Sequence, residues 1–297
     1  MLLLITGSYD GTSDRIVAAY GAGVFRLNHD IWRDYQISFS SGGWRIANPC
    51  NGLVIESDTV KSAFWWKPFL TPLEEDPYVQ EEVKYIFRDI YGWCVDKGIA
   101  RGNHFTYHSV FGKITILEKA KAYFKIPETS VSIGRLDADK FKDKKIVVKS
   151  LATARTNDGN ILITTEANIN RLDPAYPWYI QERIDSEWDV TIFYCNKECF
   201  AFKRSRADLK GLDWRAHQSN DPSRKEWFVF PLAADIKNKI VDLSREIDIS
   251  FGRYDFLLEK GSDELVFLEV NAHGQWVFLD YFEEHGLLDC VINWLKH

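Results

Sequence analysis

Hydrophobic and polar positions repeat along this chain with two periods, one typical of strands and one typical of helices. Short apolar runs that end at turn residues predict strands at 2–6, 23–28, 61–69, 144–151 and 178–184. Paired runs predict hairpins at 35–46, at 190–205 through Asn196-Lys197, and at 253–271. Apolar residues at helical spacing predict helices from about Ser13, at 79–98, at 110–129 up to Pro127, at 231–249 and at 287–296. The chain is therefore expected to have a mixed α/β (α+β) fold.

The last predicted hairpin, RYDFLLE followed by LVFLEVN, places two acids inside apolar strands. If its turn, KGSDE (260–264), is symmetric about Ser262, Asp255 lies opposite Glu269 and Glu259 lies opposite Leu265. Alternation then gives one apolar face, formed by Tyr254, Phe256, Leu258, Val266, Leu268 and Val270. Asp255, Glu269 and Asn271 share the other face.

Two carboxylates opposite each other in a sheet repel, because their Cβ atoms lie only about 5 Å apart. A cation would remove this conflict, and Mg²⁺ is commonly held by one or two carboxylates together with substrate phosphates. Asn271 would add a neutral oxygen ligand. The hairpin therefore predicts a magnesium site, with a solvated surface hairpin as the structural alternative.

Several basic residues stand where they could meet an anion. Lys149 ends an apolar strand, and Lys113 lies in the first turn of a predicted helix, where the helix dipole disfavours a cation unless an anion is near. Arg204 and Arg206 share one strand face, and Arg215 follows them; guanidinium groups suit carboxylate or phosphoryl oxygens. The alternatives are lysine stems that cover the core and a solvated basic edge.

The net charge, the first residues and the cysteine content argue against several classes of protein. The net charge of −6 over 297 residues argues against a nucleic-acid surface. The opening apolar run is too short for a signal peptide or a membrane span. The five cysteines are odd in number and form no CxxC motif, which favours free thiols in a reducing cytoplasm. A homodimer is left open.

The order of these segments resembles the ATP-grasp ligases, and most closely the graspetide (microviridin-type) peptide ligases. The resemblance is carried by SAFWWKPF, GKITILEKAKAYFKIPET, YIQERI, DWR and FLEVNAHGQW, and it extends from Leu3 to about Asp280. It implies an ATP-grasp fold with an N-terminal α/β pre-ATP-grasp domain at 1–105 and an ATP-grasp domain at 106–297. The latter would hold a lid at about 140–180 and a metal-binding part at 181–297.

The resemblance also implies a role for each candidate residue. Phosphates of ATP would contact Lys113 and Lys149, and the ribose would contact Asp189. Gln181, Glu182, Arg183 and Ile184 would form the strand beside adenine, where backbone groups of Glu182 and Ile184 bond the base. One or two Mg²⁺ ions would be held by Asp255, Glu269 and Asn271. The transferred phosphoryl group and the acyl phosphate would be held by Arg204 or Arg206, and by Arg215.

The activity implied is an ATP-dependent ligation on a peptide, which could carry a leader segment. A carboxylate is activated as an acyl phosphate and is then joined to an amine or a hydroxyl, with ADP and phosphate as products. Two alternatives remain: a ligase for free amino acids or small acids, and a nucleotide-binding regulator without turnover. Thr191 stands where the microviridin-type pattern often has arginine. His273, two residues after Asn271, is a further candidate for contact with substrate.

Overall fold

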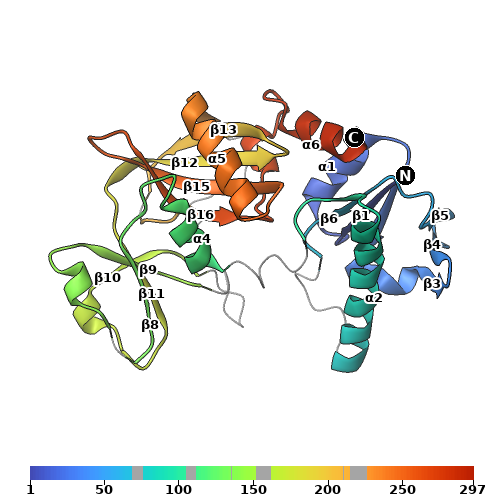
Figure 1. Ribbon diagram of the computed structural model, residues 1–297, viewed down its shortest axis with the longest axis horizontal. Helices are drawn as coiled ribbons and strands as arrows, with labels where there is room; N and C mark the ends of the chain where they lie inside the picture. Colours follow the sequence, from blue (N-terminus) through green and yellow to red (C-terminus); the bar gives the residue numbers. More distant parts are fainter. Residues whose placement is uncertain (69–75, 105–111, 135, 152–161, 210, 215–225) are drawn as a thin grey trace.

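The computed structural model describes residues 1–68, 76–104, 112–134, 136–151, 162–209, 211–214 and 226–297. The helices within these ranges are α1 (Gly11–Tyr20), α2 (Pro77–Asp96), α4 (Lys113–Ala120), α5 (Ala234–Glu246) and α6 (Leu287–Lys296). The strands are β1 (Leu2–Thr6), β2 (Val24–Asn28), β3 (Gln36–Ser40), β4 (Gly43–Asn48), β5 (Leu53–Glu56), β6 (Ser62–Trp65), β7 (Ala100–Arg101), β8 (Thr129–Ser132), β9 (Ile146–Lys149), β10 (Thr165–Ala167), β11 (Trp178–Glu182), β12 (Ser186–Cys195), β13 (Glu198–Ser205), β14 (Phe228–Val229), β15 (Phe251–Glu259) and β16 (Leu265–Asn271). Figure 1 shows their arrangement.

The N-terminal part is built on a parallel sheet with the strand order β2-β1-β6-β7. Its central strand β1 is buried along its whole length, which explains the unbroken apolar run LLLIT. Helix α1 begins at Gly11, two residues before the predicted start, because the Asp10 side chain accepts a hydrogen bond from the Ser13 amide and caps the helix. The predicted strand and helix in this segment are thus confirmed, with a shifted helix start.

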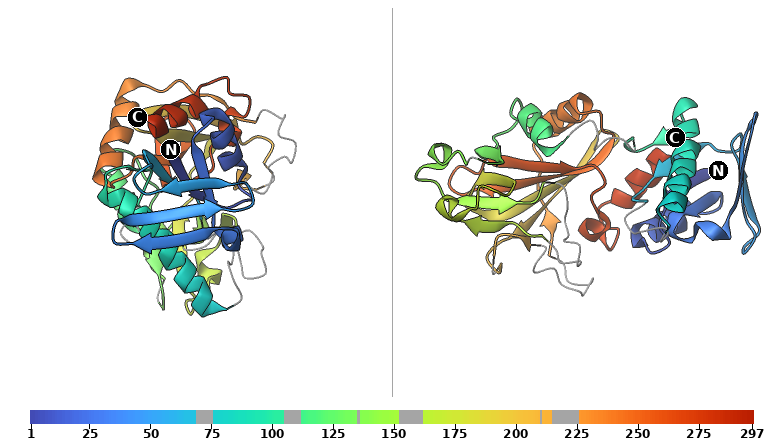
Figure 2. Two further views of the ribbon diagram at one scale, coloured as in Figure 1. Left: turned by 90° about the vertical axis from the view of Figure 1, so that its right-hand side faces the viewer. Right: turned by 90° about the horizontal axis from the view of Figure 1, so that it is seen from below.

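A second small sheet, β3-β4-β5, lies at the outer end of the N-terminal part (Figure 2). The predicted hairpin at 35–46 forms its first two strands, whereas β5 was not predicted. Trp44 and Ile46 of this sheet pack in one core with Phe25 of β2 and with Phe87 and Tyr91 of α2. The long helix α2 therefore joins the two N-terminal sheets.

The middle of the chain forms an antiparallel sheet with the order β10-β9-β11-β8, whose strands lie between Thr129 and Glu182. Its small core holds Phe141, Ile146 and Ile180. The predicted helix at 110–129 is wrong in its second half, because α4 ends at Ala120 and β8 begins at Thr129. The apolar residues after Ala120 continue the helical spacing, yet Lys125 instead makes a bridge to Val266 of β16.

The C-terminal part is an antiparallel sheet with the order β14-β13-β12-β15-β16, which contains both predicted hairpins. Asn196 and Lys197 both have positive φ, as the tight turn between β12 and β13 requires. Helices α4 and α5 cover one face, where Ile240 and Leu243 meet Tyr254 and Phe267. The other face carries the polar residues described below.

The register of the last hairpin differs from the symmetric arrangement that the sequence suggested. Near the turn, Leu258 pairs with Leu265, and the Glu259 amide donates to the Glu264 carbonyl, so the loop is one residue shorter than assumed. A bulge at Leu268 then shifts the register by one residue, and Asp255 does lie opposite Glu269. The predicted pair of acids is confirmed, but the predicted apolar face is wrong at two positions.

Those two positions show what the bulge does to the β16 side chains. Leu265 and Phe267 pack against α4 and α5, where Val266 and Leu268 were expected. Leu268 instead faces the cavity on the opposite side of the sheet, next to Glu269. The extra residue thus allows β16 to bury its apolar residues near the turn and still present an acid further on.

A continuous core connects the N-terminal and C-terminal parts. Helix α6, the end of the chain, packs against α1 and β6 of the first part and against β12 of the second. Its Leu288 and Val291 share a core with Leu4, Phe64 and Phe193. The boundary between a domain at 1–105 and one at 106–297 stays a prediction. Among the described helices, none is both long and apolar enough to cross a membrane.

Candidate active site

A cavity of about 710 Å³ lies between the middle sheet and the polar face of the C-terminal sheet. Its size is within the range of pockets that hold small molecules and cofactors. Most of the predicted site residues line it, from six separate stretches of chain: Lys113, Lys149, Gln181, Glu182, Arg183, Ile184, Asp189, Arg206, Asp255, Glu269 and Asn271. The fold therefore gathers residues that are up to 158 positions apart.

The two acids of the last hairpin sit on the floor of this cavity. Asp255 accepts a hydrogen bond from the Thr191 hydroxyl at 2.8 Å, across the β12–β15 ladder. Its carboxylate also receives two bonds from Arg253, Nε to Oδ1 and Nη2 to Oδ2, each at 3.1 Å. Glu269, on the neighbouring strand, forms an ion pair with Lys113 at 3.1 Å. Each acid is thus balanced by a cation of the chain.

The loop after β16 holds the amide that follows these acids. Asn271 Oδ1 accepts a hydrogen bond from the His273 amide at 3.2 Å, which leaves its second lone pair for another partner. A side chain at Gly274 would come within 3.0 Å of Arg253 Cβ and 3.2 Å of Asn271. Glycine at this position therefore lets the NAHGQW loop fold tightly against both residues.

Arg253 is a site residue that sequence reasoning missed. It is 8% exposed, lines the cavity, and uses its third guanidinium nitrogen to donate to the Gln275 carbonyl at 3.0 Å. The available signal was its position two residues before Asp255, on the same strand face. Thr191, at the position on β12 where an arginine was expected, hydrogen-bonds Asp255. The guanidinium group that contacts Asp255 belongs to Arg253 on β15.

The cationic side of the cavity lies near α4 and the end of β9. The Lys113 ammonium donates to the Ser150 carbonyl at 3.3 Å, in addition to its ion pair with Glu269. Lys149 also lines the cavity, from the last position of β9. Two lysine side chains and the opposing acids would suit a ligand that combines phosphates with a divalent cation.

The strand β11 and the residues after it form one wall. Gln181 is fully buried and donates through Nε2 to the Thr129 hydroxyl at 3.0 Å. The Glu182 amide donates to the Glu128 carbonyl at 2.8 Å, and the Glu182 carboxylate pairs with Lys144. An adenine contact through Glu182 would therefore use its carbonyl oxygen and not its amide.

Asp189 and Arg206 form a third ion pair at the edge of the cavity, with side chains 11% and 13% exposed. The pKa of Asp189 is raised to about 6, mainly because the side chain is buried; Arg206 and Arg204 partly offset this rise, and the negative charge of Asp255 adds to it. One carboxylate oxygen of Asp189 is buried without a hydrogen-bond partner in the described part of the chain. A ligand hydroxyl could donate to that oxygen.

One of the predicted arginines does not join this cluster, and another lies outside the described residues. Arg204 is not among the described residues that line the cavity, and its guanidinium donates to the Trp214 carbonyl at 3.3 Å and meets Glu226 at 3.5 Å. Its contact with a phosphoryl group stays a prediction. Arg215 lies outside the described residues.

Replacing Asp189 with asparagine should change how stability depends on pH. A carboxyl group whose pKa is raised in the folded state carries a penalty that is absent at low pH and is complete above the folded pKa. From pH 5 to pH 8, wild type should therefore lose about 1 kcal/mol of unfolding free energy relative to Asp189→Asn. Urea denaturation without divalent metal measures this, with the exposed Asp185→Asn as control. If the difference in unfolding free energy between wild type and Asp189→Asn were the same at pH 5 and pH 8, the raised pKa of Asp189 would be contradicted.

The oxygen atoms that Asp255, Glu269 and Asn271 present on the cavity floor fit a magnesium ion. Among the residues that the structure describes, no three His, Cys, Asp or Glu side chains gather as a metal site. Asp255, Glu269 and Asn271 instead provide two carboxylates and an amide, the oxygen ligands that Mg²⁺ takes. The sequence also places His108 four residues after His104, but His108 lies outside the described residues.

The sequence matches no protein-family model and no curated protein, whereas the structure is similar to solved ligases over its whole length. One is the RiPP-associated ATP-grasp ligase of Chryseobacterium gregarium, solved with ADP and a leader and core peptide: TM-score 0.81, 21% identity, covering 99% of this chain and 96% of that one. Another is the macrocyclase MdnC of Microcystis aeruginosa MRC, bound to its precursor peptide MdnA: TM-score 0.80, 19% identity, 100% and 99% coverage. This chain has the ATP-grasp fold.

The similarity to solved structures differs in degree from one to another. The D-cycloserine synthetase DcsG gives a TM-score of 0.56 at 11% identity, with 99% of this chain and 98% of that chain covered. The two peptide ligases cover the same share of this chain with clearly higher scores. The expected fold class is thereby confirmed, while the roles of the individual site residues stay predictions.

Proposed function

We propose that this protein is an ATP-dependent ligase that activates a carboxylate of a peptide as an acyl phosphate and joins it to an amine or hydroxyl. In its most specific form, the proposal is macrocyclisation of a ribosomal peptide. The observation that carries it is the Asp255–Glu269 pair on the floor of a cavity that Lys113 and Lys149 also line. The ATP-grasp fold over the entire chain supports it.

The charges of the cavity account for the expected chemistry. Bound Mg²⁺ would be held by Asp255, Glu269 and Asn271, and would neutralise the terminal phosphates. Lys113, released from Glu269 when the metal takes that carboxylate, would turn to the phosphates with Lys149. Arg253 and Arg206 offer guanidinium groups to the transferred phosphoryl. Phosphoryl transfer needs mainly positioning and charge neutralisation, which explains why no nucleophilic serine or cysteine is required.

A peptide substrate is preferred over a free amino acid or small acid. Solved peptide ligases, two of them bound to precursor or leader peptides, align with this chain at TM-scores of 0.80–0.81. A small-molecule synthetase aligns at 0.56. The five cysteines are free, which is compatible with action in the reducing cytoplasm. A partner peptide with a leader segment is part of the proposal.

The test is to supply ATP, Mg²⁺ and short acidic peptides that contain Ser, Thr and Lys, taken first from the reading frames beside the gene. We expect ADP as the nucleotide product and a peptide that has lost one water for each ADP formed. Release of AMP would contradict the proposal. ATP binding without ADP formation on any peptide would favour the nucleotide-binding regulator.

A further inference from the structure

The NAHGQW loop (271–276) contacts the N-terminal part of the chain near both of its ends. Near its start, the side chain of Asn103, two residues after β7, donates to the Ala272 carbonyl at 2.7 Å. Near its end, the Gln275 side chain accepts a hydrogen bond from the Thr12 hydroxyl of α1 at 2.6 Å. The loop is therefore attached to residues that lie 169 and 263 positions earlier in the sequence.

Asn103 is buried, and three hydrogen bonds fix its side-chain amide. Its Nδ2 donates to the Phe251 carbonyl at 2.6 Å as well as to the Ala272 carbonyl. Its Oδ1 accepts a hydrogen bond from the Ser250 amide at 3.1 Å. An amide nitrogen carries two hydrogens, so both donors of Asn103 are used. The side chain thus joins the start of β15 to the loop after β16.

These contacts lie where β15 and β16 separate. The pairing of the two strands ends at Arg253 opposite Asn271, whereas β15 begins two residues earlier, at Phe251. Phe251 and Ala272 are almost completely buried, and a buried carbonyl that lacks a donor costs free energy. Asn103 supplies a donor to each of these carbonyls, beyond the last pair of the ladder.

The backbone that carries Asn103 is held firmly on the N-terminal side. Arg101, the last residue of β7, pairs with Phe64 of β6, and its carbonyl accepts from the Tyr91 hydroxyl at 2.8 Å. Gly102 has a φ of +85°, and a Cβ atom there would lie 2.8 Å from the Phe64 ring. Glycine allows both this conformation and this close approach, so the segment that leads to Asn103 is fixed in place.

The contact with Asn103 sets the direction of the turn that presents Asn271. Within this turn, the Gly274 amide donates to the Asn271 carbonyl at 3.0 Å, and the His273 amide donates to Asn271 Oδ1 at 3.2 Å. These bonds fix the turn internally, whereas the Ala272 carbonyl bonds to Asn103 outside it. The position of the Asn271 side chain relative to the sheet therefore depends on Asn103.

We propose that Asn103 is a positioning residue for Asn271, so that the N-terminal part of the chain aligns one of the Mg²⁺ ligands. This inference rests on the proposed function, in which Asn271 holds Mg²⁺ together with Asp255 and Glu269. Groups that orient a metal ligand without touching the metal change metal affinity about 10–100-fold when they are replaced. Asn103 acts in this way through the Ala272 carbonyl.

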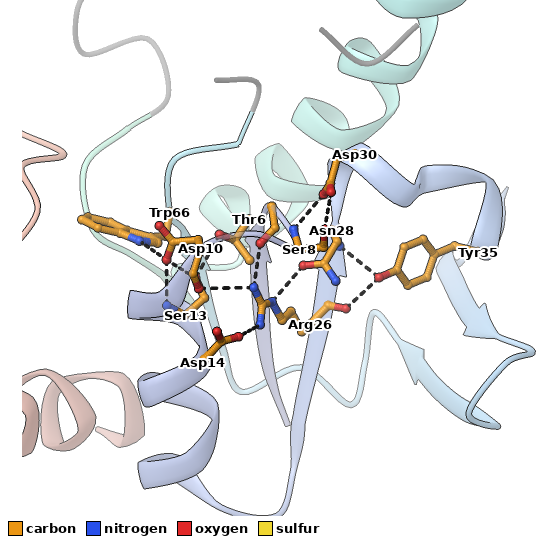
Figure 3. Close-up of polar contacts among 11 residues, drawn as sticks. Thr6, Ser8, Asp10, Ser13, Asp14, Arg26, Asn28, Asp30, Tyr35 and Trp66 are labelled. Carbon is orange, nitrogen blue, oxygen red and sulfur yellow. Dashed lines mark hydrogen bonds and ion pairs between the residues drawn. The ribbon is translucent and has the colours of Figure 1, made fainter. Parts of the chain in front are cut away.

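The other end of the loop has its own attachment, which should keep the loop in place when Asn103 is replaced. The Gln275 side chain also donates to Asp10 at 3.2 Å. Asp10 is held in turn by the Ser13 amide and by Trp66 Nε1, at 2.7 and 3.0 Å, as Figure 3 shows. Loss of the Asn103 contacts should therefore displace the Asn271 end of the loop without detaching the whole loop.

The test compares wild type, Asn103→Leu, Asn103→Ser and Ser250→Ala. Leucine has a similar size but no hydrogen bonds, and serine keeps one donor. Ser250→Ala is the matched control, because it removes the bond from the Ser250 hydroxyl to the Gly102 carbonyl at 3.1 Å and leaves the Ala272 contact intact. Calorimetry gives the affinity of each protein for the non-hydrolysable ATP analogue AMPPNP, with and without Mg²⁺. Urea denaturation checks that each variant is folded.

The quantity of interest is the factor by which Mg²⁺ tightens the binding of AMPPNP. In Asn103→Leu, this factor should fall at least about tenfold relative to wild type, while the affinity without Mg²⁺ stays within about twofold. Asn103→Ser should show a smaller fall in the same direction. Ser250→Ala should bind as wild type under both conditions.

Equal tightening by Mg²⁺ in Asn103→Leu and wild type would overturn the inference. A parallel loss of affinity with and without Mg²⁺, or failure of both Asn103 variants to fold, would show that Asn103 serves the fold as a whole, and would overturn it as well. If wild type binds no AMPPNP, or binds it no more tightly with Mg²⁺, the proposed function itself fails. The wild-type titration thus separates the two failures.

Discussion

Glu269→Gln should reduce ADP formation at least about 100-fold while the fold survives. Glutamine keeps the shape of the side chain, but it offers Mg²⁺ a neutral ligand in place of a carboxylate. The ion pair that is lost, with Lys113, is partly exposed to solvent, so the unfolding free energy should change by no more than about 1 kcal/mol.

The measurement combines ADP release with the titration of magnesium and a non-hydrolysable ATP analogue by calorimetry. Glu264→Gln is the matched control, since Glu264 is an exposed acid in the turn of the same hairpin. Full activity in Glu269→Gln would refute the metal assignment. Loss of activity in both variants would point to a general effect of charge.

Arg253→Met should have the second large effect, because it removes both a cation of the cavity and the partner of a buried acid. The side chains of Arg253 and Asp255 are 10% and 20% exposed. Breaking a buried ion pair on one side leaves the other charge without a partner, which costs about 3 kcal/mol of unfolding free energy. Activity should fall about 100-fold or more, as on loss of an oxyanion-stabilising donor.

Two further variants separate stability from chemistry at this pair. Combining Arg253→Met with Asp255→Asn removes both charges, so the unfolding free energy should recover in part while activity stays absent. Arg253→Lys keeps the charge but cannot form the two-pronged contact with Asp255, and should be intermediate in both. Guanidinium denaturation and ADP release provide the data. If Arg253→Met were as stable as wild type, the ion pair between Arg253 and Asp255 would not stabilise the fold, and this part of the account would be wrong.

The sequence predicted most of the elements because their signals are local. The buried run of β1, the Asn196-Lys197 turn and the stripe of α5 each follow from neighbouring residues. The end of α4 at Ala120 could not be predicted in this way, since Phe124 continues the helical spacing. There, the tertiary contact between Lys125 and Val266 overrides the local preference.

In the candidate site too, features set by neighbouring residues were predicted, whereas features set by tertiary contacts were not. Asp255 and Glu269 were paired correctly, yet the symmetric turn assumed for them was wrong, and only the bulge at Leu268 brings them together. Such a bulge depends on which residues the partner strand and helices bury, which a periodic pattern does not encode. Arg253 was missed because its importance comes from its bonds to Asp255 and Gln275.

The central claim is that Asp255 and Glu269 hold a magnesium ion that carries the phosphates of a nucleotide. Its most direct test is a crystal structure of the protein with Mg²⁺ and a non-hydrolysable ATP analogue. We expect Mg²⁺ at about 2.1 Å from oxygens of both carboxylates, with the γ-phosphate beside it. A nucleotide bound with its metal elsewhere, and with the two carboxylates directed away from it, would contradict the account.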